Sequence, residues 1–168
     1  MSEQPTTDVI DAVLGLGPDS DLLKLRERRG KLKHLTQTSY RAALRPAVPG
    51  NFSYAFRAAL AARMATLWKA DELAAHYRAE LDKEGATQEL LHVASGDWLP
   101  DDGGSRLAAI LRHVDLVTLR PKDATRADIE ALHAAGLNDR DIVTLAGLIA
   151  FVNYQILVVA GLKMLRDN

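Results

Sequence analysis

The chain has 168 residues, a formal net charge of −1 at pH 7 and no cysteine. The near-zero charge gives no general attraction to nucleic acid or to an anionic membrane, and the absence of cysteine excludes disulfides and thiolate metal sites. Hydrophobic residues make up 48% and aromatic residues 5% of the chain, a composition typical of a soluble globular protein built from helices rather than strands.

The first residues are polar, and no apolar segment follows a basic start, so the sequence shows no secretory signal. We therefore expect a cytoplasmic protein. Residues 1–7 are expected to form a flexible arm and residues 8–168 a single all-helical domain, because a chain of this length can bury one sizeable core.

Helices are expected wherever apolar residues recur at steps of three or four between a capping residue and a glycine or proline. In chain order, the expected helices cover residues 9–16, 21 to a stop at Gly30, 31–44, 52–81, 87–94, 105–116, 125–136 and 139–165. Their expected N-caps are Asp8, Asp19 or Ser20, Asn51 or Ser53, Ser105, Thr125 with Asp128, and Asn138 with Asp141. No strand alternation persists, so the prediction is an all-α fold of about seven or eight helices.

A basic run lies where the second expected helix meets the third, at residues 24–34 (KLRERRGKLKH). Basic residues with interleaved leucines occur both in nucleic-acid contacts and on solvated helix faces. Acidic residues elsewhere balance this run, and no aromatic platform accompanies it. We therefore interpret it as a solvated face and expect no nucleic-acid partner.

The strongest helical pattern runs over residues 52–81, after the connector that ends at Pro49-Gly50. Its larger apolar or small residues recur at steps of three or four, the period of one face of an α-helix. They are Phe56, Leu60, Met64, Leu67, Ala70, Ala74, Tyr77 and Leu81. Nothing in this window breaks a helix, so the pattern predicts one long central helix whose apolar stripe lies in the core.

Two segments carry a resemblance to a known family. Arg57, residues 61–65 with Leu67, and residues 74–77 resemble the core helix of the alkylhydroperoxidase D-like family, also called the carboxymuconolactone decarboxylase-like superfamily. Residues 135–143 and 148–155 resemble the closing helix of that family. Together the segments cover roughly half of the chain in the right order, and the resemblance implies the family's helical bundle.

The peroxidase members of that family carry a Glu, eleven further residues, Cys-x-x-Cys, three residues and a His. In this chain those positions are Ala58, Ala70, Leu73 and Tyr77. The peroxidatic step needs a thiolate, and a second thiol must resolve the sulfenic acid that forms. No shift of the alignment restores the motif, because the chain has no cysteine. Cysteine-based peroxidase activity is therefore excluded for this chain acting alone.

Other residues with suitable chemistry remain. The candidates are Arg63, Trp68, Glu72, His76, Tyr77, Asn153, Tyr154 and Gln155. Glu72 and His76 lie four residues apart, so they share a helix face and can hydrogen-bond. His76 polarised by Glu72 is a candidate general base, and a local pair near a subunit contact is the alternative. Tyr77 replaces the family's histidine and is expected to pack with its hydroxyl satisfied.

Two Glu-x-x-His pairs, Glu89 with His92 and Glu130 with His133, resemble the ligand pattern of di-iron sites in helical bundles. Both glutamates lie in the first turn of a short expected helix, where the helix dipole already favours a negative charge. We therefore expect no metal and no cofactor. In the loop over residues 95–104, Trp98 either closes over a pocket or plugs the edge of the core.

The last expected helix is apolar on nearly every side from Ile142 to Leu162. Its length would span a bilayer, but Asn153 and Gln155 would then lie at mid-membrane without partners, so we expect no membrane span. A helix that is apolar all round must be covered on every side. We expect a homo-oligomer formed through the central and C-terminal helices.

The chain particularly resembles a cysteine-free branch of the family. In that branch, a carboxymuconolactone decarboxylase-domain protein accompanies, or is fused to, a cysteine-bearing alkylhydroperoxidase-domain partner. The resemblance implies a catalytically degenerate structural or regulatory subunit linked to peroxide defence. The alternative is a thiol-independent small-molecule enzyme, lactone- or decarboxylase-like, that uses His76 and Glu72 in a pocket between the central and last helices.

Overall fold

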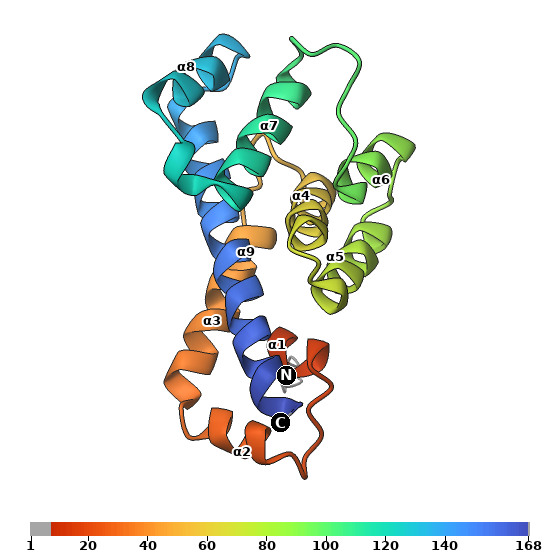
Figure 1. The fold of residues 1–168 in the computed structure, drawn as a ribbon, viewed down its shortest axis with the longest axis vertical. Helices are drawn as coiled ribbons and strands as arrows, with labels where there is room; N and C mark the ends of the chain where they lie inside the picture. The colour runs from red at the N-terminus through yellow and green to blue at the C-terminus, as the bar shows by residue number, and fades with distance from the viewer. Residues whose placement is uncertain (1–7, 168) are drawn as a thin grey trace.

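The computed structural model describes residues 8–167, and within them the fold is all-helical (Figure 1). The expected arm, residues 1–7, lies outside the described residues. The α-helices are α1 (Val9–Val13), α2 (Asp21–Glu27), α3 (Gly30–Leu44), α4 (Tyr54–Leu67), α5 (Asp71–Lys83), α6 (Gln88–Ser95), α7 (Arg106–Leu119), α8 (Arg126–Ala134) and α9 (Asp139–Arg166). A 3-10 helix, Pro121–Asp123, lies between α7 and α8.

Side-chain caps begin most of these helices, and the predicted caps are confirmed. Ser53 accepts from the N–H of Phe56 at the start of α4, and Ser105 and Asn138 cap α7 and α9 in the same way. Thr125 forms the predicted capping box with α8. Each cap satisfies an N–H group that has no partner within the helix, which is why these residues mark helix starts reliably.

The predicted stop at Gly30 is wrong. The second helix ends at Glu27, and Gly30 is instead the first residue of α3. A glycine ends a helix by adopting the left-handed conformation, and Gly30 is not among the residues with positive φ. The turn falls at Arg29, whose φ of −111° and ψ of 43° depart from helical values.

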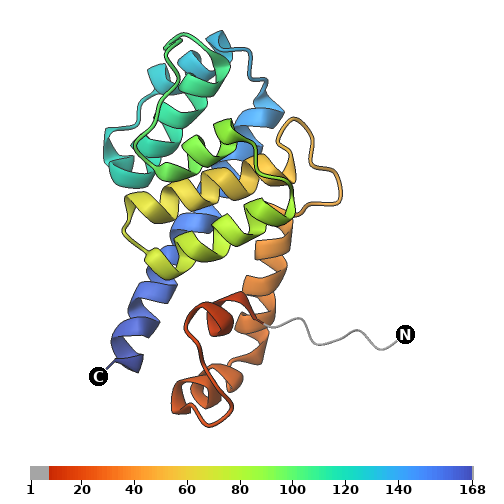
Figure 2. The same ribbon diagram turned by 90° about the vertical axis from the view of Figure 1, so that its right-hand side faces the viewer.

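The predicted single central helix is also wrong, because it is broken into α4 and α5. Lys69 adopts a left-handed φ of 55° between them. The N–H of Ala70 reaches the carbonyl of Ala65 and the N–H of Lys69 that of Thr66, both at 2.9 Å, which is a Schellman motif. The two helices run antiparallel (Figure 2). Both face one core, so the apolar spacing continues across the break and conceals it.

Helix α4 lies among α5, α6, α7 and α9, and every residue from 57 to 65 is buried (Figure 1). Helix α9 runs along the molecule and contacts α2 and α3 as well as α4, α7 and α8. At its C-terminal end, Arg166 donates to the carbonyl of Leu14 at 2.9 Å, next to α1. The helices α4 and α9 therefore form the centre of the fold.

By length and composition α9 could cross a membrane, with a mean hydropathy of 2.2 over its most apolar window. Within the protein, 44% of that window is buried, and core helices of soluble proteins have the same character. Its polar residues have protein partners: Asn153 donates to the carbonyl of Ile149 at 3.0 Å, and Gln155 accepts from Tyr77.

Candidate functional site

The four positions that correspond to the family's redox motif lie in or beside the packed core. Ala58 projects from the middle of α4, and Leu73 and Tyr77 from α5, and all three are buried. Ala70 is the N-cap residue of α5 and is partly buried. A cavity of only about 10 Å³ lies beside Ala58, which is room for a single water at most. Ala58, Leu73 and Tyr77 are therefore packed rather than open to a substrate, and Ala70 lies at the edge of the core.

Tyr77 occupies much of the space at the centre of this region. Its hydroxyl donates to the side-chain oxygen of Gln155, so it has the hydroxyl partner that was predicted. Its ring stacks on that of Tyr40, with centroids 6.5 Å apart. Burial raises the pKa of the Tyr77 phenol well above its usual value, so the side chain stays neutral and packs as an uncharged group.

Glu72 and His76 do not form the expected general-base pair. Glu72 bonds Lys163 of α9, and this contact lowers the pKa of its carboxyl group. His76 hydrogen-bonds the hydroxyl of Tyr40 at 2.9 Å, and burial lowers its pKa. Residues four apart do share a helix face, but partners from α3 and α9 engage the two side chains separately.

Arg63, another sequence candidate, belongs to a buried ion pair. Its Nε and Nη2 atoms each lie 2.6 Å from a carboxylate oxygen of Asp115, and its side chain is 1% exposed. Its Nη1 atom donates to the carbonyls of Val93 and Trp98 at 3.3 and 2.9 Å. Trp98 packs partly buried against the core, at its edge. Arg63 therefore joins α4 to α7 and to the loop after α6.

The other candidates lie along α9 or its neighbours and also have structural contacts. The indole N–H of Trp68 donates to Asn153 at 3.0 Å, and the hydroxyl of Tyr154 lies 3.1 Å from that of Thr36. The Glu-x-x-His residues are separated by other partners: His92 bonds Gln88, Glu130 bonds Arg126, and His133 bonds the carbonyl of Leu137. Among residues 8–167, no three His, Asp or Glu side chains gather as metal ligands do.

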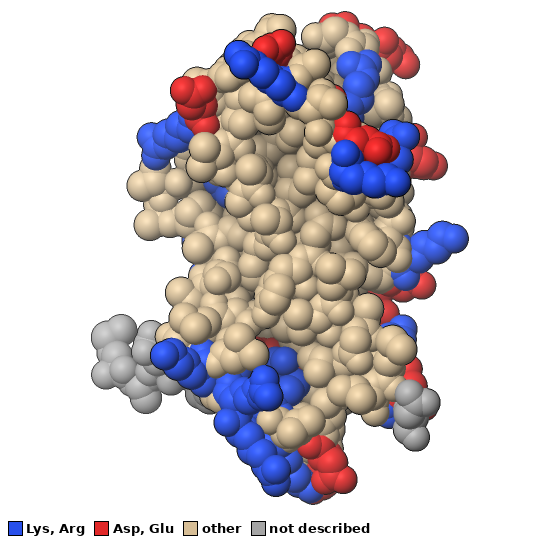
Figure 3. Space-filling model, turned by 60° about the vertical axis from the view of Figure 1, so that its left-hand side comes forward, with Lys and Arg blue, Asp and Glu red and all other residues tan. Residues whose placement is uncertain are grey.

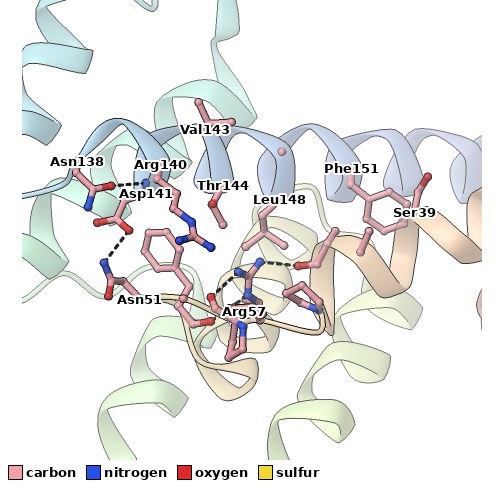
Figure 4. A pocket seen from close by; sticks show the side chains of 18 residues that line it. Ser39, Asn51, Arg57, Asn138, Arg140, Asp141, Val143, Thr144, Leu148 and Phe151 are labelled. Carbon is pink, nitrogen blue, oxygen red and sulfur yellow. Dashed lines mark hydrogen bonds between the residues drawn. The ribbon is translucent and has the colours of Figure 1, made fainter.

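A cleft of about 600 Å³ lies elsewhere, between the end of α3, the connector over residues 45–53 and the first half of α9 (Figure 4). Arg57 forms part of its lining and is 3% exposed. Its guanidinium donates to the carbonyls of Phe52, Ala43 and Pro49 at 3.0, 2.8 and 2.9 Å. These bonds hold the connector against α3. Burial lowers the pKa of Arg57 from its usual value, but an arginine remains protonated in proteins.

One carboxylate lines this cleft. Asp141 is buried and accepts from Asn51 at 2.9 Å and from Arg106 at 3.1 Å. Burial by itself raises the pKa of Asp141, but the hydrogen bonds from Arg106 and Asn51 outweigh it, so the net pKa is lowered. Asp141 is therefore ionised and its charge is offset by Arg106, while Arg140 also lines the cleft and is exposed.

Sequence reasoning missed this cleft. Its two walls come from segments about ninety residues apart, as the bond between Asn51 and Asp141 shows. The one local signal was the stiff Pro46-to-Gly50 connector, which forms a rim of the cleft.

No family model matches the chain, and no curated protein sequence matches it. A solved structure does resemble it, that of an uncharacterized peroxidase-related protein from Silicibacter sp. TM1040. The two proteins share an all-helical fold. The TM-score is 0.65 at 20% sequence identity, over 77% of this chain and 66% of that one, so the chain spans just under two thirds of its neighbour's length. At this identity the likeness establishes the fold alone.

The break at Lys69 places Ala70 at the N-terminus of α5. Unpaired backbone N–H groups and the helix dipole favour a negative charge there, and a thiol at such a position has a lowered pKa. The methyl group of alanine cannot use this field. The backbone at Ala70 is therefore suited to a thiolate, but the chain has no cysteine to place there.

Proposed function

We propose that this chain is a catalytically degenerate relative of the alkylhydroperoxidase D-like peroxidases and serves as a structural or regulatory subunit linked to peroxide defence. One observation carries the proposal: three of the four positions of the redox motif, Ala58, Leu73 and Tyr77, are packed in the core. Leu73 and Tyr77 are fully buried, and the space beside Ala58 has room for one water at most. The fold shared with a peroxidase-related protein, together with a chain that has no cysteine, supports a scaffold that has lost its redox centre.

The subunit is proposed to act as an oligomer through α9. The exposed apolar side chains on the C-terminal half of this helix form an α9 patch, made by Tyr154, Leu157, Met164 and Leu165. Figure 3 brings forward the side on which α9 lies in Figure 1 and shows a broad surface without charged residues, with charges gathered toward its ends. Exposed apolar patches commonly mark interfaces. The prediction also included the central helix, residues 52–81; its first part, α4, has buried central residues and no such patch, so we propose α9 as the main interface.

The proposed partner is a cysteine-bearing alkylhydroperoxidase-domain protein, which would supply the thiols. This part of the proposal derives from the resemblance to the cysteine-free branch. We place a thiol-independent enzyme second, because Glu72 is engaged by Lys163 and His76 by Tyr40. Neither residue lines the 600 Å³ cleft.

A peroxide assay tests the catalytic half of the proposal. The purified chain, treated with a chelator, is incubated with tert-butyl hydroperoxide and dithiothreitol, and consumption of the hydroperoxide is followed. We expect no consumption beyond that in buffer, because no thiolate is present to attack the O–O bond. Saturable turnover by the chain alone would overturn the proposal.

Co-purification tests the partner, and light scattering tests the oligomer. Addition of this chain is expected to change the assembly size or the peroxidase rate of the cysteine-bearing protein, and the absence of both effects would refute the partnership.

Alone, the chain is expected to elute as a multimer that Leu157→Glu disrupts. The matched control is Leu119→Glu, since Leu119 is similarly exposed but lies on α7. A monomeric wild-type chain would refute the α9 interface.

A further inference from the structure

The cleft between α3, the connector over residues 45–53 and α9 carries an unbalanced positive charge. Arg57 is buried, and all three acceptors of its guanidinium are neutral backbone carbonyls. Among the residues that the structure describes, Arg140 has no ion-pair or hydrogen-bond partner for its side chain. The one carboxylate in the lining, Asp141, is already paired with Arg106. Two guanidinium groups therefore face the cleft without a counter-ion.

The geometry of the cleft concentrates this charge. In Figure 4 the guanidinium of Arg140 points into the cleft, on the side where that of Arg57 lies. Arg57 uses three N–H groups on carbonyls, and a guanidinium has five. Each of these features favours an anion over a neutral ligand.

The rest of the lining combines polar groups with apolar side chains, and the volume is large. Phe52, Leu148 and Phe151 line the cleft beside the polar groups. The volume of about 600 Å³ lies within the range of small-molecule sites. A free phosphate ion would leave most of this volume and all of this apolar surface unused. A carboxylate on an apolar body matches both halves of the lining.

We propose that this cleft binds a small organic monocarboxylate. The carboxylate accepts hydrogen bonds from Arg140 in the field of Arg57, and the apolar body packs against Val48 and the accessible edge of Phe151. The site shares no residue with the positions of the redox motif or with the α9 patch. The proposal therefore goes beyond the scaffold function and stands or falls independently of it.

Calorimetric titration of the full chain tests the proposal, with benzoate and hexanoate as probes. Benzamide serves as the neutral counterpart of benzoate, and inorganic phosphate as the anion without an apolar body. We expect one carboxylate per chain and binding of benzamide and phosphate that is weaker by on the order of tenfold or more. Arg140→Gln is expected to weaken benzoate or hexanoate binding by about tenfold, because a charge-assisted hydrogen bond is lost.

Two variants keep the test independent of stability. Arg140 is exposed, so its substitution leaves the fold intact, whereas Arg57 is left unchanged because it holds the connector. The control is Arg120→Gln, which removes an exposed guanidinium outside the cleft and is expected to leave affinity unchanged. Absence of binding by both carboxylates at about 10 mM, equal affinity for phosphate, or an unchanged affinity of Arg140→Gln would each overturn the proposal.

Discussion

Replacing Asp115 by alanine removes the counter-ion of a deeply buried charge. The guanidinium of Arg63 is 1% exposed and holds both carboxylate oxygens of Asp115 at 2.6 Å. Loss of one partner from a buried pair costs about 3–5 kcal/mol, because the remaining charge stays in a low-dielectric interior. The Asp115 side chain is 26% exposed, so water can enter the space it leaves and partly solvate Arg63. We therefore expect about 3 kcal/mol, near the lower limit of that range.

Urea denaturation followed by circular dichroism measures this loss, and calorimetry gives the melting temperature. For a chain of this size, about 3 kcal/mol corresponds to a fall in Tm of roughly 6–12 °C. The double variant Arg63→Met/Asp115→Ala is expected to lose less than the sum of the single variants, because the uncompensated charge is gone. Asp123→Ala is the control, since its pair with Arg120 is exposed and 4.0 Å long. A loss below about 0.5 kcal/mol for Asp115→Ala, the level expected of an exposed pair, would refute the reasoning.

Three further predictions follow from the backbone and from one histidine. Lys69→Gly is expected to stabilise the protein by about 0.5–1 kcal/mol, because Lys69 has a φ of 55°, which glycine adopts without steric cost. The control, Ala79→Gly within α5, should destabilise the protein by about 1 kcal/mol. Shifts of the two urea midpoints in the same direction would contradict this prediction. Gly96→Ala is expected to lower the free energy of unfolding by about 1–3 kcal/mol in the same assay, because the φ of Gly96 is +91° and the new Cβ would lie 3.1 Å from Thr66 Cγ2. An unchanged stability would contradict the left-handed conformation of this residue. Burial lowers the pKa of His76, so the unfolded chain binds more protons than the folded one, and the free energy of unfolding should fall as the pH drops below about 6.5. The variant His76→Gln should flatten that part of a profile of Tm against pH. An identical slope in the variant would contradict the role given to His76.

The features that sequence predicted well are local. Ser53, Ser105 and Asn138 cap their helices because each needs only an N–H group three residues ahead. The all-helical class was also predictable, because it follows from the apolar periodicity. The shared fold was indicated by the two segments that carry the family resemblance, within residues 57–77 and 135–155. The break at Lys69 was not, because one left-handed residue leaves the spacing of its apolar neighbours unchanged.

The site was harder to predict, because its partners are distant in the chain. Helical spacing correctly puts Glu72 and His76 on adjacent turns, but Lys163 is 91 residues from the first and Tyr40 is 36 residues from the second. The cleft also depends on Arg57, whose acceptors lie only 5, 14 and 8 residues away but are backbone carbonyls that no residue pattern reveals. Tertiary contacts rather than local propensity decide which polar groups meet.

Helix α9 also determines how the protein unfolds. Its 28 residues extend for about 42 Å and give an apolar wall both to α2 and α3 and to α4, α7 and α8. Neither group of helices can detach without exposing apolar surface of α9 to solvent. Amide protons at the two ends of α9 should therefore exchange with solvent through a shared opening, and the described part of the chain should melt as one cooperative unit.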